Sequence, residues 1–61
     1  MSAVGDIYVS HGDIPYLVVD CREMANKVYM FYLLDMYSGE INTWIEPNGD
    51  QLAPSYWTYL G

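Results

Sequence analysis

The chain has 61 residues, of which 52% are hydrophobic and 16% are charged, and its eight acidic residues outnumber two basic ones to give a net charge of −6. This hydrophobic content excludes a disordered chain, because disordered chains lack the apolar residues that a core needs. Two cations, Arg22 and Lys27, are too few to bind the phosphates of a nucleic acid, and the negative charge disfavours binding to anionic membranes.

Five short strands, separated by turn residues at regular spacing, are expected along the chain, and this pattern is typical of a small all-β fold. The expected strands are residues 6–9, 14–21, 27–36, 40–46 and 58–60. Gly39 is expected to adopt a positive φ in a tight hairpin between the third and fourth strands. Residues 22–27 are expected to form a loop, and residues 54–57 a single helical turn.

The alternation of side chains along the two central strands indicates which residues lie inside. We expect Ile41 and Ile45 of the fourth strand to face the core, because a register slip by one residue would expose both. The third strand is apolar at both parities, so it is expected either to be covered on both faces within the fold or to contact the core with one face and an interface with the other. The expected core comprises Ile7, Val9, Leu17, Val19, Val28, Met30, Tyr32, Leu34, Ile41, Ile45, Leu52 and Leu60.

The apolar residues left outside this core are expected to form a protein-binding face. Exposed apolar patches usually mark interaction sites, and aromatic and methionine side chains are enriched at the centres of interfaces. The expected apolar anchors are Tyr29, Phe31, Leu33, Met36, Tyr37 and Trp44, with Asp35, Glu40 and Glu46 as a charged rim. Packing under loops and the terminal turn is the alternative place for several of these side chains.

No group of residues points to catalysis. His11 is expected to be a solvated turn residue, and a general base or a metal ligand assisted by Asp13 is the alternative. Cys21 is expected to be a small core side chain, because the neighbouring Arg22 points to the other face of an alternating strand and does not activate it. One histidine and one cysteine do not assemble a nucleophile, a base and an orienting group. We therefore expect no enzyme, no metal site and no cofactor.

The cellular location and the role of the acidic charge follow from simple patterns. A single cysteine excludes an internal disulfide, and neither a signal peptide nor an apolar run long enough to span a membrane is found, so a cytoplasmic location is expected. The eight carboxylates are scattered singly and lack the spacing of a calcium-binding loop. They are interpreted either as a solvated rim or as an acidic face that binds a partner with a basic surface.

Three segments resemble small barrel proteins. Residues 4–8 are similar to the hydrophobic-Gly-Asp entry of Src-homology-3-type barrels, and residues 54–56 resemble the Pro-Ser-Asn-Tyr turn of the peptide-binding members. Residues 28–40 resemble the long third strand and hairpin of Tudor-type barrels and of short barrel proteins encoded by bacteriophages. The resemblance implies a single all-β domain over residues 1–61, a five-stranded antiparallel Src-homology-3-like (SH3-like) barrel with a one-turn helix before the last strand.

These observations together predict a small, acidic, non-enzymatic protein-binding module. The resemblance implies a phage or bacterial accessory protein that modulates or inhibits a host protein in the host cytoplasm. Two alternatives stay open. In the first, the apolar face joins identical chains into a homo-oligomer, as in a structural or virion component. Otherwise a Tudor-like aromatic cage of Tyr8, Tyr16, Tyr37 and Trp44, with Asp35 as the acid, binds a methylated cation.

Overall fold

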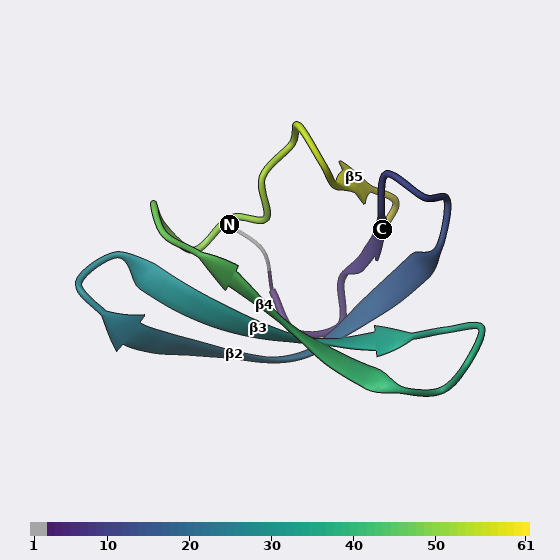
Figure 1. Cartoon of the computed structure of the whole chain (residues 1–61), viewed down its shortest axis with the longest axis horizontal. Coiled ribbons are helices and arrows are strands. Elements are labelled where there is room, and N and C mark those ends of the chain that lie inside the picture. The colour runs from purple at the N-terminus through teal and green to yellow at the C-terminus, as the bar shows by residue number, and fades with distance from the viewer. Residues whose placement is uncertain (1–2) are drawn as a thin grey trace.

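The fold is a single antiparallel sheet of five strands, crossed on one face by a long loop (Figure 1). The structure is a computed structural model and describes residues 3–61. Its strands are β1 (Ile7–Val9), β2 (Pro15–Ala25), β3 (Val28–Asp35), β4 (Ile41–Glu46) and β5 (Thr58–Tyr59). The order across the sheet is β4-β3-β2-β1-β5. The five expected strands are confirmed within a few residues, and residues 1 and 2 of the expected domain lie outside the described residues.

The sheet is open, so the expected barrel is not closed by hydrogen bonds. β4 pairs with β3 alone and the two-residue β5 pairs with β1 alone, which leaves β4 and β5 as the two edges. The expected helical turn is also absent, because no part of residues 3–61 is helical. In its place, the backbone N–H groups of Tyr56 and Trp57 both donate to the carbonyl of Ala53, at 3.0 and 2.9 Å. This segment is one hydrogen-bonded turn, too short to propagate as a helix.

β2 extends four residues beyond its expected end, through the segment expected to be a loop. Arg22 pairs with Met30 and Glu23 with Tyr29, so the long β3 strand supplies a hydrogen-bonding partner along this whole stretch. Strand preference depends strongly on such pairing, which overrides the helix-forming composition of residues 22–27. The register shifts between Val18 and Asp20, and a bulge of this kind bends a strand and increases its twist.

Two short hairpins connect the central strands. The expected positive φ of Gly39 is confirmed at 79°, in the turn between β3 and β4. Asp35 stabilises the same turn, because its Oδ1 accepts hydrogen bonds from the backbone N–H groups of Tyr37 at 2.8 Å and Ser38 at 3.0 Å. β2 and β3 are joined by two residues only, the second of which, Lys27, has a φ of 62°.

The core lies on the sheet face that is covered by residues 47–57, which we call the inner face. Figure 1 shows this loop arching from β4 over the sheet to β5. The buried apolar side chains are Tyr8, Val18, Phe31 and Leu33 from the strands and Leu52 and Trp57 from the loop. A loop, and not a second sheet, therefore closes the core from above.

The expected side-chain parity of β3 and β4 is wrong. Phe31 and Leu33 are 0% and 1% exposed, whereas Ile41 and Ile45 of β4 are 60% and 54% exposed. Leu52 is the one member of the expected core that is buried. Ile41, Ile45 and Leu60 are exposed, and the other members are half-buried. The side chains do alternate between the two faces as expected, but an alternating pattern does not say which of the two sets faces the core. Trp44 partners Phe31 across the ladder, and these larger side chains occupy the inner face in place of the isoleucines.

We expect Leu52→Ala to lower the free energy of unfolding by about 2–5 kcal/mol, because the change removes buried apolar contacts and leaves a cavity. Leu60→Ala is the matched control, since Leu52 is 1% exposed and Leu60 62% exposed. The control should cost less than about 0.5 kcal/mol. Urea unfolding followed by tryptophan fluorescence measures both values. Equal costs would contradict the placement of residues 47–57 over the inner face.

Candidate functional site

A small hollow lies between β4 and the turn at residues 53–57, and its volume is about 80 Å³. Four aromatic residues line it together with smaller neighbours: Ser10, Tyr16, Leu33, Asn42, Thr43, Trp44, Tyr56 and Trp57. Sites that enclose drug-sized molecules or cofactors usually measure about 300–1,000 Å³. The hollow therefore fits one side chain or a group of similar size.

The four aromatic rings form one connected cluster around Trp57. The centroid of the Trp57 ring lies 5.3 Å from Tyr16 and 5.3 Å from Trp44, and both pairs meet edge to face. Tyr56 stacks on Trp44 with centroids 5.0 Å apart and an angle of 20° between the planes. His11 in turn stacks on Tyr56 at 6.0 Å. Such pairs stabilise by about 0.5–1.5 kcal/mol beyond area burial, so the cluster fixes the shape of the hollow.

Glu46 links this cluster to the loop above the sheet. It is 7% exposed, and its Oε2 accepts hydrogen bonds from Trp44 Nε1 at 2.6 Å and from the backbone N–H of Ala53 at 3.1 Å. A buried carboxylate requires such donors, because an unpaired buried charge is strongly destabilising. Ala53 also accepts the two hydrogen bonds of the turn that carries Tyr56 and Trp57. One carboxylate therefore sets the positions of the aromatic residues on both sides of the hollow.

Asp35 is a second carboxylate near the aromatic cluster, in addition to Glu46. It lies opposite Tyr16 in the β2–β3 ladder. Burial raises the pKa of Tyr16, and the charges of Asp35 and Tyr56 raise it further. The backbone N–H groups of Ser38 and Tyr37 lower the pKa of Asp35, so this carboxylate is negative well below neutral pH. A negative charge beside the aromatic rings favours a cationic ligand group.

The structure does not bring the expected protein-binding residues together on one surface. Phe31 and Leu33 lie in the core, and Glu46 is buried under the loop, so none of these three is a surface anchor or a rim residue. Their placement follows from the inverted parity of β3 and β4, which puts both apolar residues of β3 beneath residues 47–57. The expected face is therefore divided between the interior and two separate surface regions.

The other expected binding residues remain accessible to different degrees. Met36 is 47% and Tyr37 76% exposed, and Glu40 is exposed in the same hairpin. Tyr29 and Trp44 are half-buried and pack against the core cluster. Of these residues, Trp44 alone lines the hollow, so the hairpin at residues 36–40 is a separate surface.

The structure brings together two of the four aromatic residues of the expected cage. Tyr16 and Trp44 both line the hollow. Tyr8 is 2% exposed and belongs to the core, and Tyr37 points away from the core at the hairpin, so neither completes a cage. Tyr56 and Trp57 line the hollow beside them, and sequence reasoning missed these two residues. The signal that pointed to them was the turn at residues 54–56, which resembles a turn of peptide-binding domains.

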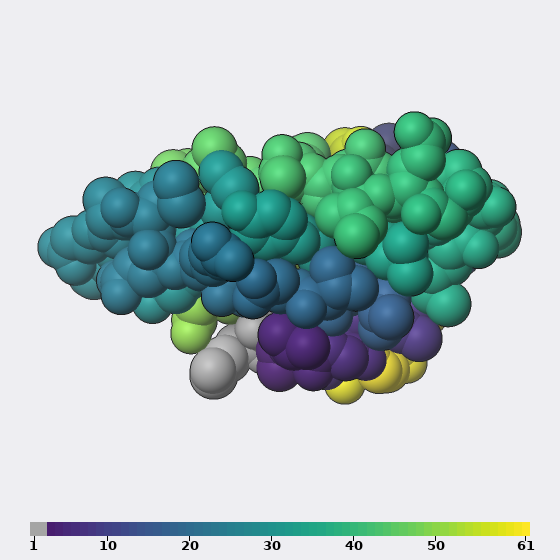
Figure 2. Space-filling view, turned by 90° about the horizontal axis from the view of Figure 1, so that it is seen from below, coloured from purple at the N-terminus to yellow at the C-terminus, as the bar shows by residue number. Residues whose placement is uncertain are grey.

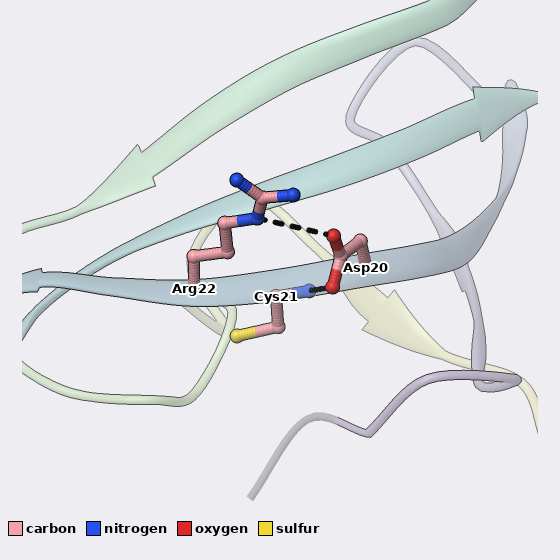
Figure 3. Close-up of polar contacts among 3 residues, drawn as sticks. All are labelled: Asp20, Cys21 and Arg22. Carbon is pink, nitrogen blue, oxygen red and sulfur yellow. Dashed lines mark hydrogen bonds and ion pairs between the residues drawn. The ribbon is translucent and has the colours of Figure 1, made fainter.

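Cys21 and His11 are placed as the sequence predicts. Cys21 packs against the core cluster, and burial raises the pKa of its thiol, with further contributions from Asp50 and Asp20. A raised pKa reduces the thiolate that a nucleophilic cysteine needs. Figure 3 shows Cys21 pointing to one side of β2 and Arg22 to the other, which confirms the expected alternation. His11 is exposed, in the turn between β1 and β2.

Within the described part of the chain, no three His, Cys, Asp or Glu residues are grouped so that they would hold a metal ion. Residues 3–61 also contain no helix that is long and apolar enough to cross a membrane. Comparisons of the chain with protein-family models, with curated proteins and with solved structures gave no match. The geometry of the molecule therefore carries the functional argument.

We expect Glu46→Ala to lower the free energy of unfolding by about 1–3 kcal/mol, because it leaves the N–H groups of Trp44 and Ala53 without their acceptor. Glu46→Gln is the matched control, since an amide oxygen in the position of Oε2 still accepts both hydrogen bonds. Urea unfolding measures stability, and near-ultraviolet circular dichroism reports the order of the tryptophans. If the alanine variant were as stable as the glutamine variant, the carboxylate would not hold the loop.

Asp35 should make stability depend on pH on the acidic side. Its pKa is lowered in the folded chain, so its contribution is present above the ordinary aspartate value of about 3.9 and is lost as pH falls through the lower folded value. We expect Asp35→Asn to be less stable than the unaltered chain at about pH 6, with a difference that shrinks toward about pH 2. Urea midpoints across this range test the effect. A constant difference would mean that the charge of Asp35 contributes nothing.

Proposed function

We propose that this chain is a small non-enzymatic protein-binding module that takes one side chain of a partner protein into the aromatic hollow. The observation that carries the proposal is the connected cluster of Tyr16, Trp44, Tyr56 and Trp57 around a space of about 80 Å³. Tyrosine and tryptophan are the residues most enriched at the energetic centres of protein interfaces. Their positions are held in advance by ring packing and by Glu46, which reduces the entropy lost on binding.

The accessibility of Tyr56 supports a peptide as the ligand. Tyr56 is 41% exposed and stacks on Trp44, which leaves part of the cluster open to a partner. A bound peptide therefore meets an apolar aromatic surface that is already accessible.

The charge of the chain supports a partner with a basic surface. The chain has eight acidic residues and only two basic ones, and Asp35 is the ladder partner of Tyr16, which lines the hollow. A field of this sign attracts cationic partners and accelerates their association at low salt. The negative charge of the chain therefore contributes to binding by orienting a basic partner, one side chain of which then enters the hollow.

An aromatic cage for a methylated cation is the second candidate function. It is favoured by the stacked pair of Trp44 and Tyr56, since a quaternary ammonium group binds over the faces of such rings. The cage proposed now consists of Tyr16, Trp44, Tyr56 and Trp57, with Asp35 as the nearby acid. The two functions differ in what drives binding, which is apolar burial in the first and charge in the second.

The finer description of the fold and the biological role are part of the same proposal. We propose an SH3-like arrangement, supported by the strand order with β1 between β2 and β5, by the bulge in β2 and by the turn before β5. The sequence resemblance of residues 28–40 to short phage-encoded barrel proteins is the basis for proposing an accessory role in the host cytoplasm, in which the hollow binds a host protein and modulates or inhibits it.

Tyr56→Ala should weaken binding to the hollow by about tenfold or more, because it removes one aromatic wall, while Tyr37→Ala, on the separate hairpin surface, should leave binding unchanged. The probes are three matched peptides with lysine, trimethyl-lysine or its neutral tert-butyl isostere at the central position. Binding is measured by the change in tryptophan fluorescence, since Trp44 and Trp57 both line the hollow. Salt should weaken binding of the cationic peptides.

The three peptides separate the two candidate functions. Similar affinity for the trimethyl-lysine and tert-butyl peptides indicates apolar burial and supports the protein-binding module. Much tighter binding of the trimethyl-lysine peptide indicates the cage. A chain that binds none of the three peptides, or that binds them equally well after Tyr56→Ala, would contradict a binding role for the hollow.

A further inference from the structure

The sheet face opposite the loop, which we call the outer face, is apolar and uncovered. Figure 2 looks onto it, and β1 to β4 lie side by side there with no other described segment crossing them. The ladder register places an aliphatic row across four strands: Ile41, Leu34, Leu17 and Ile7 are successive partners. Ile41 and Ile45 of β4 are 60% and 54% exposed, so the apolar surface of this face is accessible.

The outer face is electrically neutral, in contrast to the chain as a whole. Of the charged residues in the strands, Asp20 and Arg22 alone occupy outer-face positions, because Glu23, Asp35 and Glu46 align with the inner face. Asp20 Oδ2 and Arg22 Nε lie 3.3 Å apart, and both side chains extend over the same side of β2 (Figure 3). The net charge of −6 therefore lies elsewhere on the molecule. A basic partner has nothing to bind on this face.

The dimensions of the outer face fit a small and weak dimer interface. The molecule measures 32 × 21 × 17 Å, and Figures 1 and 2 together show that the outer face spans the longest and shortest dimensions. A rectangle of these two dimensions is slightly smaller than the roughly 600–1,000 Å² that each partner contributes to a standard interface. Interfaces below the standard size are typical of weak, reversible complexes, so we expect a dimer that dissociates at micromolar concentrations.

We propose that the outer face is covered by the outer face of a second copy of this chain, as a symmetric dimer of packed sheets. Two aliphatic sheet faces pack directly against each other, as in a β-sandwich. Under twofold symmetry each contact occurs twice with the roles exchanged, so the Arg22 of each copy can meet Asp20 of the partner subunit. Two copies of a neutral face can pack together without like-charge repulsion, whereas two copies of a charged face would repel each other.

Sedimentation velocity of the purified full chain, from about 1 µM to about 200 µM, tests the proposal over the range expected for such an interface. The unaltered chain should show a reversible equilibrium between monomer and dimer. Ile41→Lys should raise the dimer dissociation constant at least about tenfold, because it places a charge in the apolar row. Tyr37→Lys is the matched control: it adds the same charge at a site that is 76% exposed but outside the sheet face, and it should leave the constant unchanged.

A second variant guards against misfolding of the first. Ile45→Arg places a bulky cation at a second exposed position of the outer face, since Ile45 is 54% exposed and partners Met30 in the ladder. It should weaken the dimer as Ile41→Lys does, with an unchanged near-ultraviolet circular dichroism spectrum. A chain that is monomeric throughout the concentration range would overturn the proposal. So would a dimer that both variants leave intact, since association would then use another surface, such as the free edge of β4.

Discussion

Closure of the inner face by residues 47–57 is the constraint on which the rest of the structure depends. A five-stranded sheet of this length cannot bury one of its faces unless another part of the chain covers it, and this loop is what is available. Leu52 and Trp57 supply the apolar cover, while Glu46 binds the loop backbone at Ala53. The same contacts decide which face is inside, and they place Tyr56 and Trp57 beside Trp44. Core and hollow are thus built by a single feature.

The positions of the strands were predictable from the sequence, but their orientation was not. Turn residues such as Gly39 and the asparagine and glycine after Pro47 separate the apolar segments at distances that only short strands fit. The inside of β4 was misassigned because alternation has two phases, and the two isoleucines appeared to be the stronger core signal. β3 gave no further information, since it is apolar at both parities. The loop of residues 47–57, which follows β3 and β4 in the chain, determines which face of these strands is covered.

The candidate site was predictable only in the types of residue that form it. Aromatic residues near a carboxylate were expected, and Tyr16, Trp44 and Asp35 were among those named. Tyr56 and Trp57 were not, because their contacts with β4 join segments twelve or more residues apart that no local pattern relates. A buried glutamate is equally hard to foresee, as glutamate is rarely buried unless it is paired. The indole N–H of Trp44, two residues away on the same face of β4, was the one local sign of such a partner.

The two proposed surfaces lie on opposite sides of one thin sheet, and this arrangement links them. A chain of 61 residues has too few residues to cover both faces of its sheet, so an apolar face remains once the loop has closed the other. Pairing of outer faces buries that remainder and leaves both hollows directed away from the contact, each under its own loop. In the proposed dimer, a partner that reaches both hollows would bind the second one intramolecularly after the first is filled. The second site would then strengthen the weak binding expected of a single hollow of about 80 Å³.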